Sequence, residues 1–430
     1  MSLYAPANAE SVFTYGSPRL KFGPGSSSEL GFELASLGAR RVLLVTDAGV
    51  AATGAPERIV KQVSDAGIET VTYASTHVEP TDASLSDAIA FARDRGPFDA
   101  VVALGGGSSI DTAKAVNLLT TNDGDLMDYI NAPVGAGRAP AKALLPLVAL
   151  PTTTGTGSES TTICVLDVLD QHVKTGISHP RLRPELAIVD PELTMSQPSG
   201  VTAAAGMDIL CHALESWTAR PYTSYERKQP EQRVPYCGSN PVSDVWAEKA
   251  MRLLAGSFRT AVRDGDDGTA RHEMALAATF AGMGFGNAGV HVPHANAYPI
   301  AGLVRDFRPD GYPSAEPMVP HGMAVSLTAP EAFRFTFDAD PQRHLDAARM
   351  LDPTVEVDVA DPSGVLPSVL TALMRDIGIP NGIGAVGFGP GDVDAIVSGT
   401  MKQQRLLATA PKPVSEQDVA GIVERSITLW

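Results

Sequence analysis

The sequence predicts two domains: an α/β domain with a Rossmann-like parallel sheet over residues 1–198, and an all-helical domain over residues 199–430. In the first part, apolar strands alternate with helical segments, which is typical of a parallel sheet covered on both faces. After about residue 198, strand-like alternation nearly vanishes and helical spacing takes over. A chain of 430 residues is long enough to give each domain its own core.

The first domain shows short apolar runs that end in turn residues. RRVLLVTD at 40–47 is the first of these, and it is followed by an amphipathic stretch at 56–66. A second predicted helix covers 82–95. Further strands are predicted at 69–75, 98–107, at the start of 144–159, and at 161–167, 173–178 and 186–190. Strands separated by helices in this way favour βαβ units and a parallel sheet.

The second domain is expected to begin in PELTMSQPSG, where two prolines and a glycine punctuate the chain. Helical spacing then recurs at 201–219, 242–263, 269–286, 322–334, 364–377 and 415–428. Two polar, proline-rich stretches, 219–241 and 305–320, interrupt these helices. Both are longer than ordinary connections, which is typical of a functional or disordered loop.

Composition and charge exclude several classes of function. A net charge of -16 disfavours nucleic acid and anionic membranes as partners, because both would be repelled. The longest apolar run, 143–150, is too short to cross a bilayer. The amino terminus has neither the basic start nor the apolar core of a signal peptide. Three scattered cysteines, Cys164, Cys211 and Cys237, indicate reduced thiols, so we expect a cytoplasmic protein.

A glycine-rich turn, GGGSS, follows the strand predicted at 98–107. Glycine has no Cβ, so the amides of Gly105, Gly106, Gly107 and Ser108 can approach a phosphate closely. The helix that they open directs its positive end at the same anion. The motif differs from GxGxxG, and glycine turns often serve only chain geometry.

A second turn, PTTTGTGSE at 151–159, adds hydroxyl groups at another strand end. Its hydroxyl-bearing candidates are Thr152, Thr153 and Thr156. In doubly wound sheets, ligands bind outside the carboxyl ends of the strands, where both turns would lie. The two turns together favour a bound dinucleotide.

Two carboxylates adjoin these turns. Asp47 ends the first strand; it could accept hydrogen bonds from an adenosine ribose, and its charge would repel a 2′-phosphate, which favours NAD over NADP. From this residue alone, a simple cap on the following turn is equally compatible. Asp111, in the helix after GGGSS, is either a cofactor-site residue or an ordinary first-turn helix carboxylate.

Four candidate metal ligands lie in the second domain. Asp208 and His212 are four residues apart in GMDILCHALESW, so a helix places both on one face. His294 and His321 can complete a set of one carboxylate and three imidazoles, which suits Fe(II), Zn(II), Mn(II) or Co(II). His291 lies one turn before His294 and could compete with it. Each histidine alone could be a satisfied core or surface residue, but few other polar groups lie near them, and buried polar groups need partners.

These motifs, in this order, resemble the iron-containing (group III) alcohol dehydrogenase family over nearly the whole chain: GGGSSIDTAK, PTTTGTGSE, KTGIS, GMDILCHALESW, HVPHANAYP and PHGM. The resemblance implies a fold like that of dehydroquinate synthase, with NAD beside a divalent metal, Fe(II) favoured and Zn(II) possible. It implies that the metal ligands are Asp208, His212, His294 and His321. It also implies that the nicotinamide cofactor is contacted by residues 105–108, residues 152–156, Asp47 and Lys174.

The chain departs from the family pattern in two places. The family commonly has a second histidine four residues after the third ligand, often assigned to proton relay, and Tyr298 stands there. Tyr298 is a relay candidate, or it simply packs with an ordinary hydroxyl hydrogen bond. His294 and His321 are 27 residues apart, with an insertion that carries Arg305 and Arg308. Both features, with CGSNPVSDVWAEKA, resemble the hydroxyacid–oxoacid transhydrogenase branch, which passes hydride between 4-hydroxybutyrate and 2-oxoglutarate while the cofactor stays bound.

The expected function is a metal-dependent NAD oxidoreductase that acts on a small hydroxy acid or alcohol and a carbonyl compound. A dicarboxylate substrate needs cationic anchors, for which Arg305 and Arg308 are candidates, beside Arg220 and Arg233 in the other insertion. A conventional alcohol or aldehyde oxidoreductase with exchanging NAD(H) is the first alternative. A lyase of the dehydroquinate synthase type is the second, although few cationic residues lie near the ligand set to bind a phosphorylated sugar. A homodimer or larger assembly is the expected state.

Overall fold

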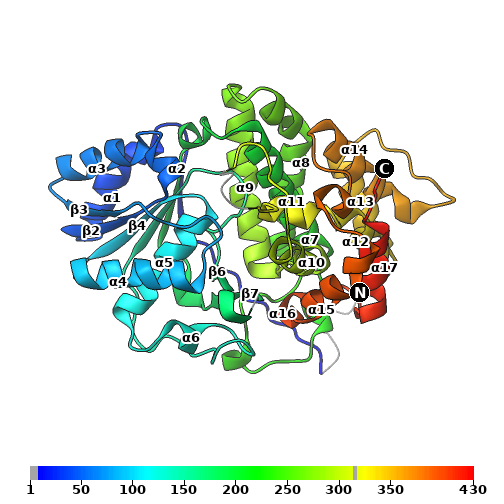
Figure 1. Cartoon of the computed structure of the whole chain (residues 1–430), viewed down its shortest axis with the longest axis horizontal. Helices are drawn as coiled ribbons and strands as arrows, with labels where there is room; N and C mark the ends of the chain where they lie inside the picture. Colours follow the sequence, from blue (N-terminus) through cyan, green and yellow to red (C-terminus); the bar gives the residue numbers. More distant parts are fainter. Residues whose placement is uncertain (1–7, 172, 313–316) are drawn as a thin grey trace. The chain divides into compact units, whose positions relative to one another are not determined.

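The structure is a computed structural model of the chain, and it describes residues 8–171, 173–312 and 317–430 (Figure 1). It contains two compact units. The first is Ser17–Gln197, and the second is Pro198–Trp430 together with the residues that precede Ser17.

The first unit is built on a six-stranded sheet in which all the paired strands are parallel. Its strand order is β1-β8-β5-β4-β2-β3. The bounds are β1 Arg19–Phe22, β2 Arg41–Val45, β3 Glu69–Tyr73, β4 Ala100–Gly105, β5 Leu147–Pro151 and β8 Leu186–Val189. The remaining strands, β6 Ile163–Val168 and β7 Val173–Ser178, form a separate antiparallel pair. The parallel sheet confirms the predicted fold class, and β1, which had no clear sequence signal, completes one edge.

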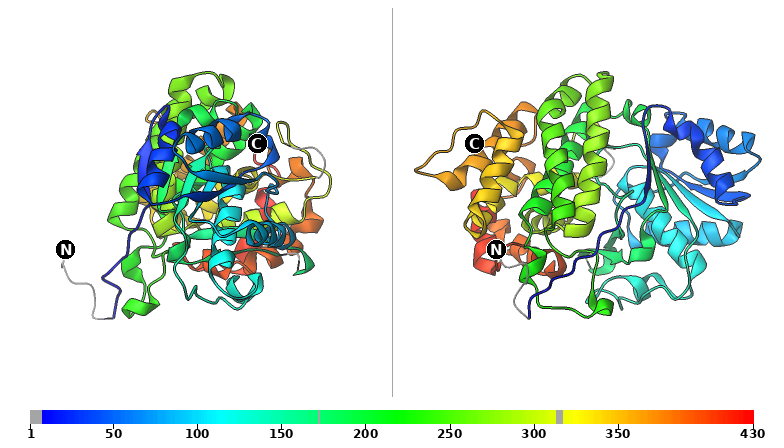
Figure 2. Two further views of the ribbon diagram at one scale, coloured as in Figure 1. Left: turned by 90° about the vertical axis from the view of Figure 1, so that its left-hand side faces the viewer. Right: turned by 180° about the vertical axis from the view of Figure 1, so that it is seen from behind.

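Helices cover both faces of this sheet, as Figures 1 and 2 show. Alternate residues of the strands enter two different cores: Val101 packs on the face covered by α4 and α5, and Val102 on the face covered by α1 and α3. This two-sided burial explains why the strands appear in the sequence as continuous apolar runs. The helices are α1 Leu30–Ser36, α2 Ala48–Ala51, α3 Ala55–Asp65, α4 Asp82–Arg95, α5 Gly107–Thr121 and α6 Leu126–Tyr129.

The second unit is helical throughout its described residues, apart from loops. Its central helix, α7 Ser199–Thr218, is almost entirely buried and packs against α8, α9 and α11. A Cβ on Gly206 would lie 2.1 Å from a ring carbon of Phe258, so a glycine is required for α8 to approach α7 this closely. The other helices are α8 Pro241–Arg263, α9 Gly268–Ala288, α10 Val292–Gly302, α11 His321–Ser326, α12 Ala329–Thr336, α13 Pro341–Leu351, α14 Val365–Asp376, α15 Val393–Met401, α16 Gln404–Leu407 and α17 Glu416–Arg425.

Two bounds differ from the sequence expectation in ways that bear on the site and on the domain division. The helix expected at 322–334 is divided into α11 and α12, because Pro330 starts a new helix in its first turn. The residues just before Ser17, expected in the first domain, belong to the helical unit: Glu10 N donates to Tyr225 O at 2.8 Å, and Gly16 N donates to Asn287 Oδ1 at 2.9 Å. Residues 1–7 of the predicted first domain, and 313–316 of the predicted 305–320 loop, lie outside the described residues.

Within the described residues, no helix combines the length and the apolar character needed to span a bilayer.

Candidate functional site

One oxygen of Asp208 is the point on which three imidazoles converge in the helical unit. The Nε2 atoms of His212, His294 and His321 lie 3.7, 3.5 and 3.9 Å from Asp208 Oδ1. The ligand atoms of Asp208, His294 and His321 all lie within 4.8 Å of one another, which makes them a possible metal site. His212 approaches the same oxygen but is not part of that mutual set. The structure therefore brings all four expected ligands together.

Three helices supply these side chains. Helix α7 carries Asp208 and His212 one turn apart, α10 carries His294 in its first turn, and His321 is the first residue of α11. A Cβ on Gly322 would lie 2.1 Å from Ala204 O and 2.7 Å from Asp208 Cβ. Glycine after His321 is thus what allows α11 to lie directly against α7 and bring its histidine to the aspartate.

Burial and charge keep this group in a definite protonation pattern. Asp208, His212 and His294 are buried, and the side chain of His321 is 24% exposed. Burial would raise the pKa of Asp208, but the surrounding imidazoles outweigh it and hold that pKa well below its usual range. Burial lowers the pKa of His212 to about 3. Asp208 is thus ionised and His212 neutral, the forms in which these two residues can bind a metal.

The donor set fits a divalent metal ion. Among the described residues, Asp208 Oδ1 and His294 Nε2 are buried and have no hydrogen-bond partner. Buried polar atoms are nearly always satisfied, so two unsatisfied acceptor atoms facing one another fit ligands that a cation would satisfy. Separations of 3.5–3.9 Å between ligand atoms are what donors at about 2.0–2.2 Å from a shared ion would show.

Glu215 is a functional residue that the sequence analysis missed. It is fully buried on α7, accepts hydrogen bonds from the backbone N of His291 at 2.7 Å and of His294 at 3.3 Å, and pairs closely with His294 Nδ1. Burial would lower the pKa of His294, but Glu215 and Asp208 raise it to about 9. Such an outer carboxylate fixes which imidazole nitrogen faces a metal. Its place seven residues after Asp208, two turns along the same helix face, was a usable signal.

His291, the possible competitor of His294, has a different role. Its ring is fully buried, and its Nε2 meets Thr218 Oγ1 at 3.0 Å. Burial lowers the pKa of His291 to about 4. It is therefore a neutral core histidine beside the site.

An apolar wall adjoins the ligands, formed by Phe285, Val290, Ala295, Tyr298 and Leu406. The ring of Phe285 stacks on His212 with centroids 3.8 Å apart, and the ring of Tyr298 lies 6.1 Å from that of His321. Tyr298 thus lies next to the ligand group, as the sequence comparison implied for the relay position. Its role there remains a proposal.

In the other unit, the glycine turn lies between β4 and α5 and touches the second predicted turn. A Cβ on Gly106 would lie 3.0 Å from Thr153 Oγ1, and one on Gly107 would lie 2.7 Å from Thr156 Cγ2. Helix α5 has no side-chain hydrogen bond at its N-cap, and residues 106–108 are partly exposed. Open amides at the start of a 15-residue helix fit a bound diphosphate.

Asp47 lies beside the glycine turn. One oxygen caps α2 by accepting from Val50 N at 3.0 Å, and the other accepts from Ser109 Oγ at 3.1 Å. The capping role considered from the sequence is therefore present, and the carboxylate also ties the end of β2 to the start of α5. Contact with a ribose remains a proposal.

Asp111 uses both carboxylate oxygens inside the protein. It accepts from Ser158 Oγ at 2.6 Å and from Val165 N at 2.9 Å. Lys114, one turn later and fully buried, donates to Ser158 O, Ser158 Oγ and Ile163 O at 2.7–2.9 Å. These contacts favour the interpretation of Asp111 as a structural helix carboxylate, which holds the 151–159 turn against α5.

Lys174 is buried between two carboxylates. Its Nζ lies 2.7 Å from Glu79 Oε2 and 2.7 Å from Asp167 Oδ2. Burial would lower the pKa of Lys174, but these two charges outweigh it and raise the pKa. Glu79 is the residue other than glycine that has a positive φ, 57°, within the described residues, so the chain is strained where it holds this lysine. Neither carboxylate was predicted: Glu79 is 95 residues from Lys174, and Asp167 meets it through the antiparallel register of β6 and β7.

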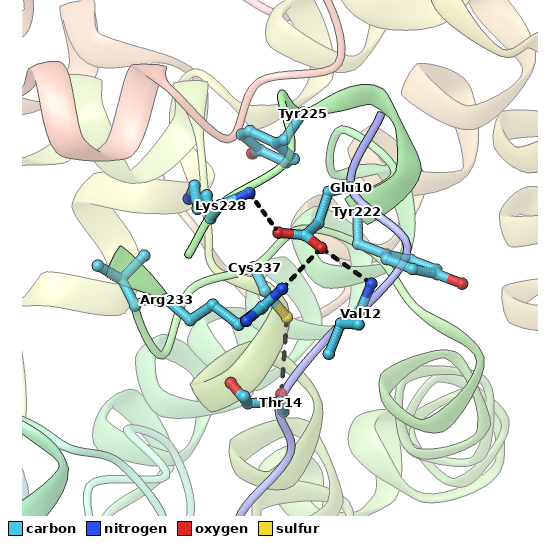
Figure 3. Close-up of a pocket in the computed structure, with 9 residues that line it drawn as sticks. Glu10, Val12, Thr14, Tyr222, Tyr225, Lys228, Arg233 and Cys237 are labelled. Atoms are coloured by element: carbon cyan, nitrogen blue, oxygen red, sulfur yellow. Dashed lines mark hydrogen bonds and ion pairs between the residues drawn. The ribbon is translucent and has the colours of Figure 1, made fainter. Parts of the chain in front are cut away.

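The arginines proposed as substrate anchors have other partners. Arg305 pairs with Asp392 at 2.7 Å and Arg308 donates to Asp306 O at 3.0 Å, and both are exposed. Arg220 donates to Ser224 Oγ at 2.8 Å. Figure 3 shows Arg233 paired with Glu10, with 3.1 Å between Nη2 and Oε1.

Comparison with known proteins gives consistent matches along the chain. Residues 17–191 match the family described as iron-containing alcohol dehydrogenase, and residues 231–427 match the C-terminal domain of the Fe-containing alcohol dehydrogenase family. A mitochondrial hydroxyacid-oxoacid transhydrogenase of Xenopus laevis is 42% identical over 99% of this chain and 93% of its own length. The protein of that name from Homo sapiens is 41% identical over 97% of this chain and 90% of its own.

Solved structures agree. A 1,3-propanediol oxidoreductase superposes with a TM-score of 0.83 at 31% identity, covering 96% of this chain and 100% of its own. A sulfoacetaldehyde reductase from Bifidobacterium kashiwanohense in complex with NAD+ has a TM-score of 0.79 at 25% identity, over 96% of this chain and 98% of its own.

Proposed function

The chain belongs to the iron-containing alcohol dehydrogenase family, and from that premise we propose that it is a hydroxyacid–oxoacid transhydrogenase. It oxidises 4-hydroxybutyrate to succinate semialdehyde and reduces 2-oxoglutarate to 2-hydroxyglutarate, with NAD held throughout the cycle. The observation that carries the proposal is the identity of 41–42% to proteins of that name over nearly the full length of both chains.

The proposed cofactors are NAD and one divalent metal ion, Fe(II) before Zn(II). When bound, the metal supplies Lewis-acid polarisation of an alcohol or carbonyl oxygen, and NAD supplies reversible hydride storage. Asp208, His212, His294 and His321 would hold the metal. A donor set made only of oxygen and nitrogen atoms suits either ion, so the availability of each metal decides which one is bound.

The chain's own residues would bind the cofactor and transfer the substrate's proton. The open amides of residues 106–108 would bind the diphosphate, and the charge of Asp47 would select NAD over NADP. Lys174 and the hydroxyls of residues 152–156 would also contact the cofactor. Tyr298 would carry the alcohol proton between the substrate and solvent, since its phenol lies beside His321.

A paired assay tests this function on purified protein reconstituted with Fe(II). One arm supplies 4-hydroxybutyrate and excess NAD and records NADH. The other supplies 4-hydroxybutyrate and 2-oxoglutarate with no added nicotinamide and records 2-hydroxyglutarate. Product in the second arm, absent with His294→Ala, is the expected result. NADH in the first arm alone contradicts transhydrogenation.

A conventional dehydrogenase with exchanging NAD is the second candidate. It is favoured by the 31% identity and TM-score of 0.83 to a structure named 1,3-propanediol oxidoreductase. The first arm of the assay distinguishes it, because only exchanging NAD gives continuous NADH production.

The assembly and the compartment are part of the proposal. We propose a homodimer or larger assembly in the cytoplasm; the named relatives are mitochondrial proteins. All three cysteines are free, which suits a reducing compartment. Light scattering of the purified protein measures the assembly, and cell fractionation measures the compartment.

A further inference from the structure

We propose that Arg405, on α16, binds the substrate's carboxylate group while the reacting carbon lies at the metal ligands. This inference rests on the proposed function for the identity of the substrate, an anionic hydroxy acid or oxo acid. It replaces Arg305 and Arg308 as the anchor, since the structure gives those side chains other partners.

Arg405 is a partly exposed cation with one buried, unpartnered nitrogen. Its Nη1 is buried and, within residues 8–171, 173–312 and 317–430, has no hydrogen-bond partner. No ion pair to it is present among the same residues. Arg233 also has a buried, unpaired nitrogen, Nε, but its charge is met by Glu10 at 3.1 Å.

The guanidinium of Arg405 is held in place by an aromatic ring. Its Cζ lies 5.2 Å from the ring centroid of Tyr236. Stacking on an aromatic face stabilises the cation without using its N–H donors. The planar donor edge therefore remains available for a carboxylate, which arginine can bind with two parallel hydrogen bonds.

The segment 405–409, which carries Arg405, packs against α10 and the residues just before it. Leu406, the next residue, belongs to the apolar wall with Phe285 and Tyr298. Thr409 Oγ1 donates to Val290 O at 2.5 Å, just before the start of α10. α16 packs directly on α10, which bears His294 and Tyr298.

Tyr236, in the loop at 219–241, packs near the same segment as Arg405. A Cβ on Gly289, at the end of α9, would lie 3.0 Å from Thr409 Cγ2 and 3.4 Å from Tyr236 Cβ. Residues 236, 289 and 405–409 thus form one packed group next to the apolar wall. Arg405 is therefore carried by a segment that packs against the wall adjoining the ligand cluster.

Electrostatics requires such a residue. The chain has a net charge of -16, which repels small anions, and two of its carboxylates, Asp208 and Glu215, are buried at the site. A buried donor without an acceptor is unfavourable, and a bound carboxylate removes that cost. The guanidinium of Arg405 and the anionic substrate therefore have complementary charges.

The test uses glutarate, which has the carbon number of 2-oxoglutarate but no group to oxidise or reduce. Its binding to the metal-loaded, NAD-containing protein is measured by calorimetry for wild type, Arg405→Met, Arg405→Lys and Arg349→Met. Arg349 is an exposed arginine paired with Asp346 on α13 and serves as the matched control. We expect Arg405→Met to weaken binding by about 10- to 100-fold. Arg405→Lys should recover part of it, and Arg349→Met should bind as wild type does.

The kinetic counterpart compares 4-hydroxybutyrate with 1-butanol, which has the same carbon chain and no charge. Arg405→Met should raise the KM for 4-hydroxybutyrate and leave the rate with 1-butanol unchanged. Equal losses for both substrates, or unchanged glutarate affinity in Arg405→Met, would overturn the assignment. If glutarate binding depends on Arg405 but the paired assay gives no 2-hydroxyglutarate, the anchor stands and the transhydrogenase proposal fails alone.

Discussion

At the scale of single residues, Glu215 orients His294, one of the proposed metal ligands. The carboxylate of Glu215 pairs with His294 Nδ1 and accepts hydrogen bonds from two backbone N–H groups. The other ring nitrogen of His294, Nε2, is therefore directed at Asp208. A neutral amide in its place keeps the shape but removes the charge that orients the imidazole. Glu215→Gln should therefore weaken metal binding by about 10- to 100-fold.

Competition with a chelator, followed by metal analysis, measures this change directly and does not depend on turnover. Glu248→Gln is the matched control, because Glu248 is exposed and pairs with Arg252 on α8. Equal metal retention by Glu215→Gln and wild type would show that His294 needs no outer carboxylate.

The residue scale also shows what could be predicted from the sequence. Asp208 and His212 were predicted as a pair because their spacing fixes their relation on any helix. His294 and His321 were candidates from the residues alone, but the family resemblance was needed to assign them, since no local pattern states which distant histidines meet. Arg405 had no signal of either kind, because its contact with Tyr236 links segments that are distant in the sequence.

At the scale of elements, α5 and the 151–159 turn are joined by one buried lysine. Lys114 donates to the Ser158 carbonyl and hydroxyl and to Ile163 O, and it lies 3.5 Å from Asp111. Removing it leaves Asp111 as a buried charge without a cation. Lys114→Met should therefore lower the free energy of unfolding by about 3–5 kcal/mol and, because the turn loses its attachment, weaken NAD binding.

Urea unfolding and NAD fluorescence titration measure the two effects. Lys61→Met is the control, since Lys61 is exposed and pairs with Asp65 on α3. Adding Asp111→Asn to Lys114→Met should recover part of the stability by removing the unpaired charge. A double variant no more stable than the single one would contradict this explanation.

Elements were predictable where periodicity was strong. The strands of the parallel sheet and helices such as α8 and α9 agree with their expected ranges to within a few residues. Helices α13 and α15 were not predicted, because both are short and lie among turns rich in proline, glycine and aspartate. Strand β1 was missed because its residues, RLKF, are half polar, as suits an edge strand.

At the scale of the whole molecule, residues 8–16 belong to the helical unit, although the next 181 residues, Ser17–Gln197, form the other. The sequence assigned this end to the first domain because it has no periodicity to indicate its partner. Glu10 is one attachment: its carboxylate accepts from Lys228 N at 3.0 Å and pairs with Arg233, and within its own segment it accepts from Ser11 N and Val12 N at 3.0 Å each (Figure 3).

This attachment should depend on pH. Burial would raise the pKa of Glu10, but hydrogen bonds from Lys228, Val12 and Arg233 outweigh it and lower the pKa from 4.5 to about 2. A carboxylate whose pKa is lower in the folded state adds stability that is complete above about pH 4.5 and is lost as the pH falls toward 2. Glu10→Gln should thus be less stable than wild type at pH 7, and the difference should shrink steadily between pH 4.5 and pH 3. Urea unfolding at pH 7, 4.5 and 3 measures it, with Glu416→Gln, an exposed glutamate in the first turn of α17, as control. A difference that stays constant across this range would mean that Glu10 stabilises the attachment through packing and neutral hydrogen bonds, with no contribution from its charge.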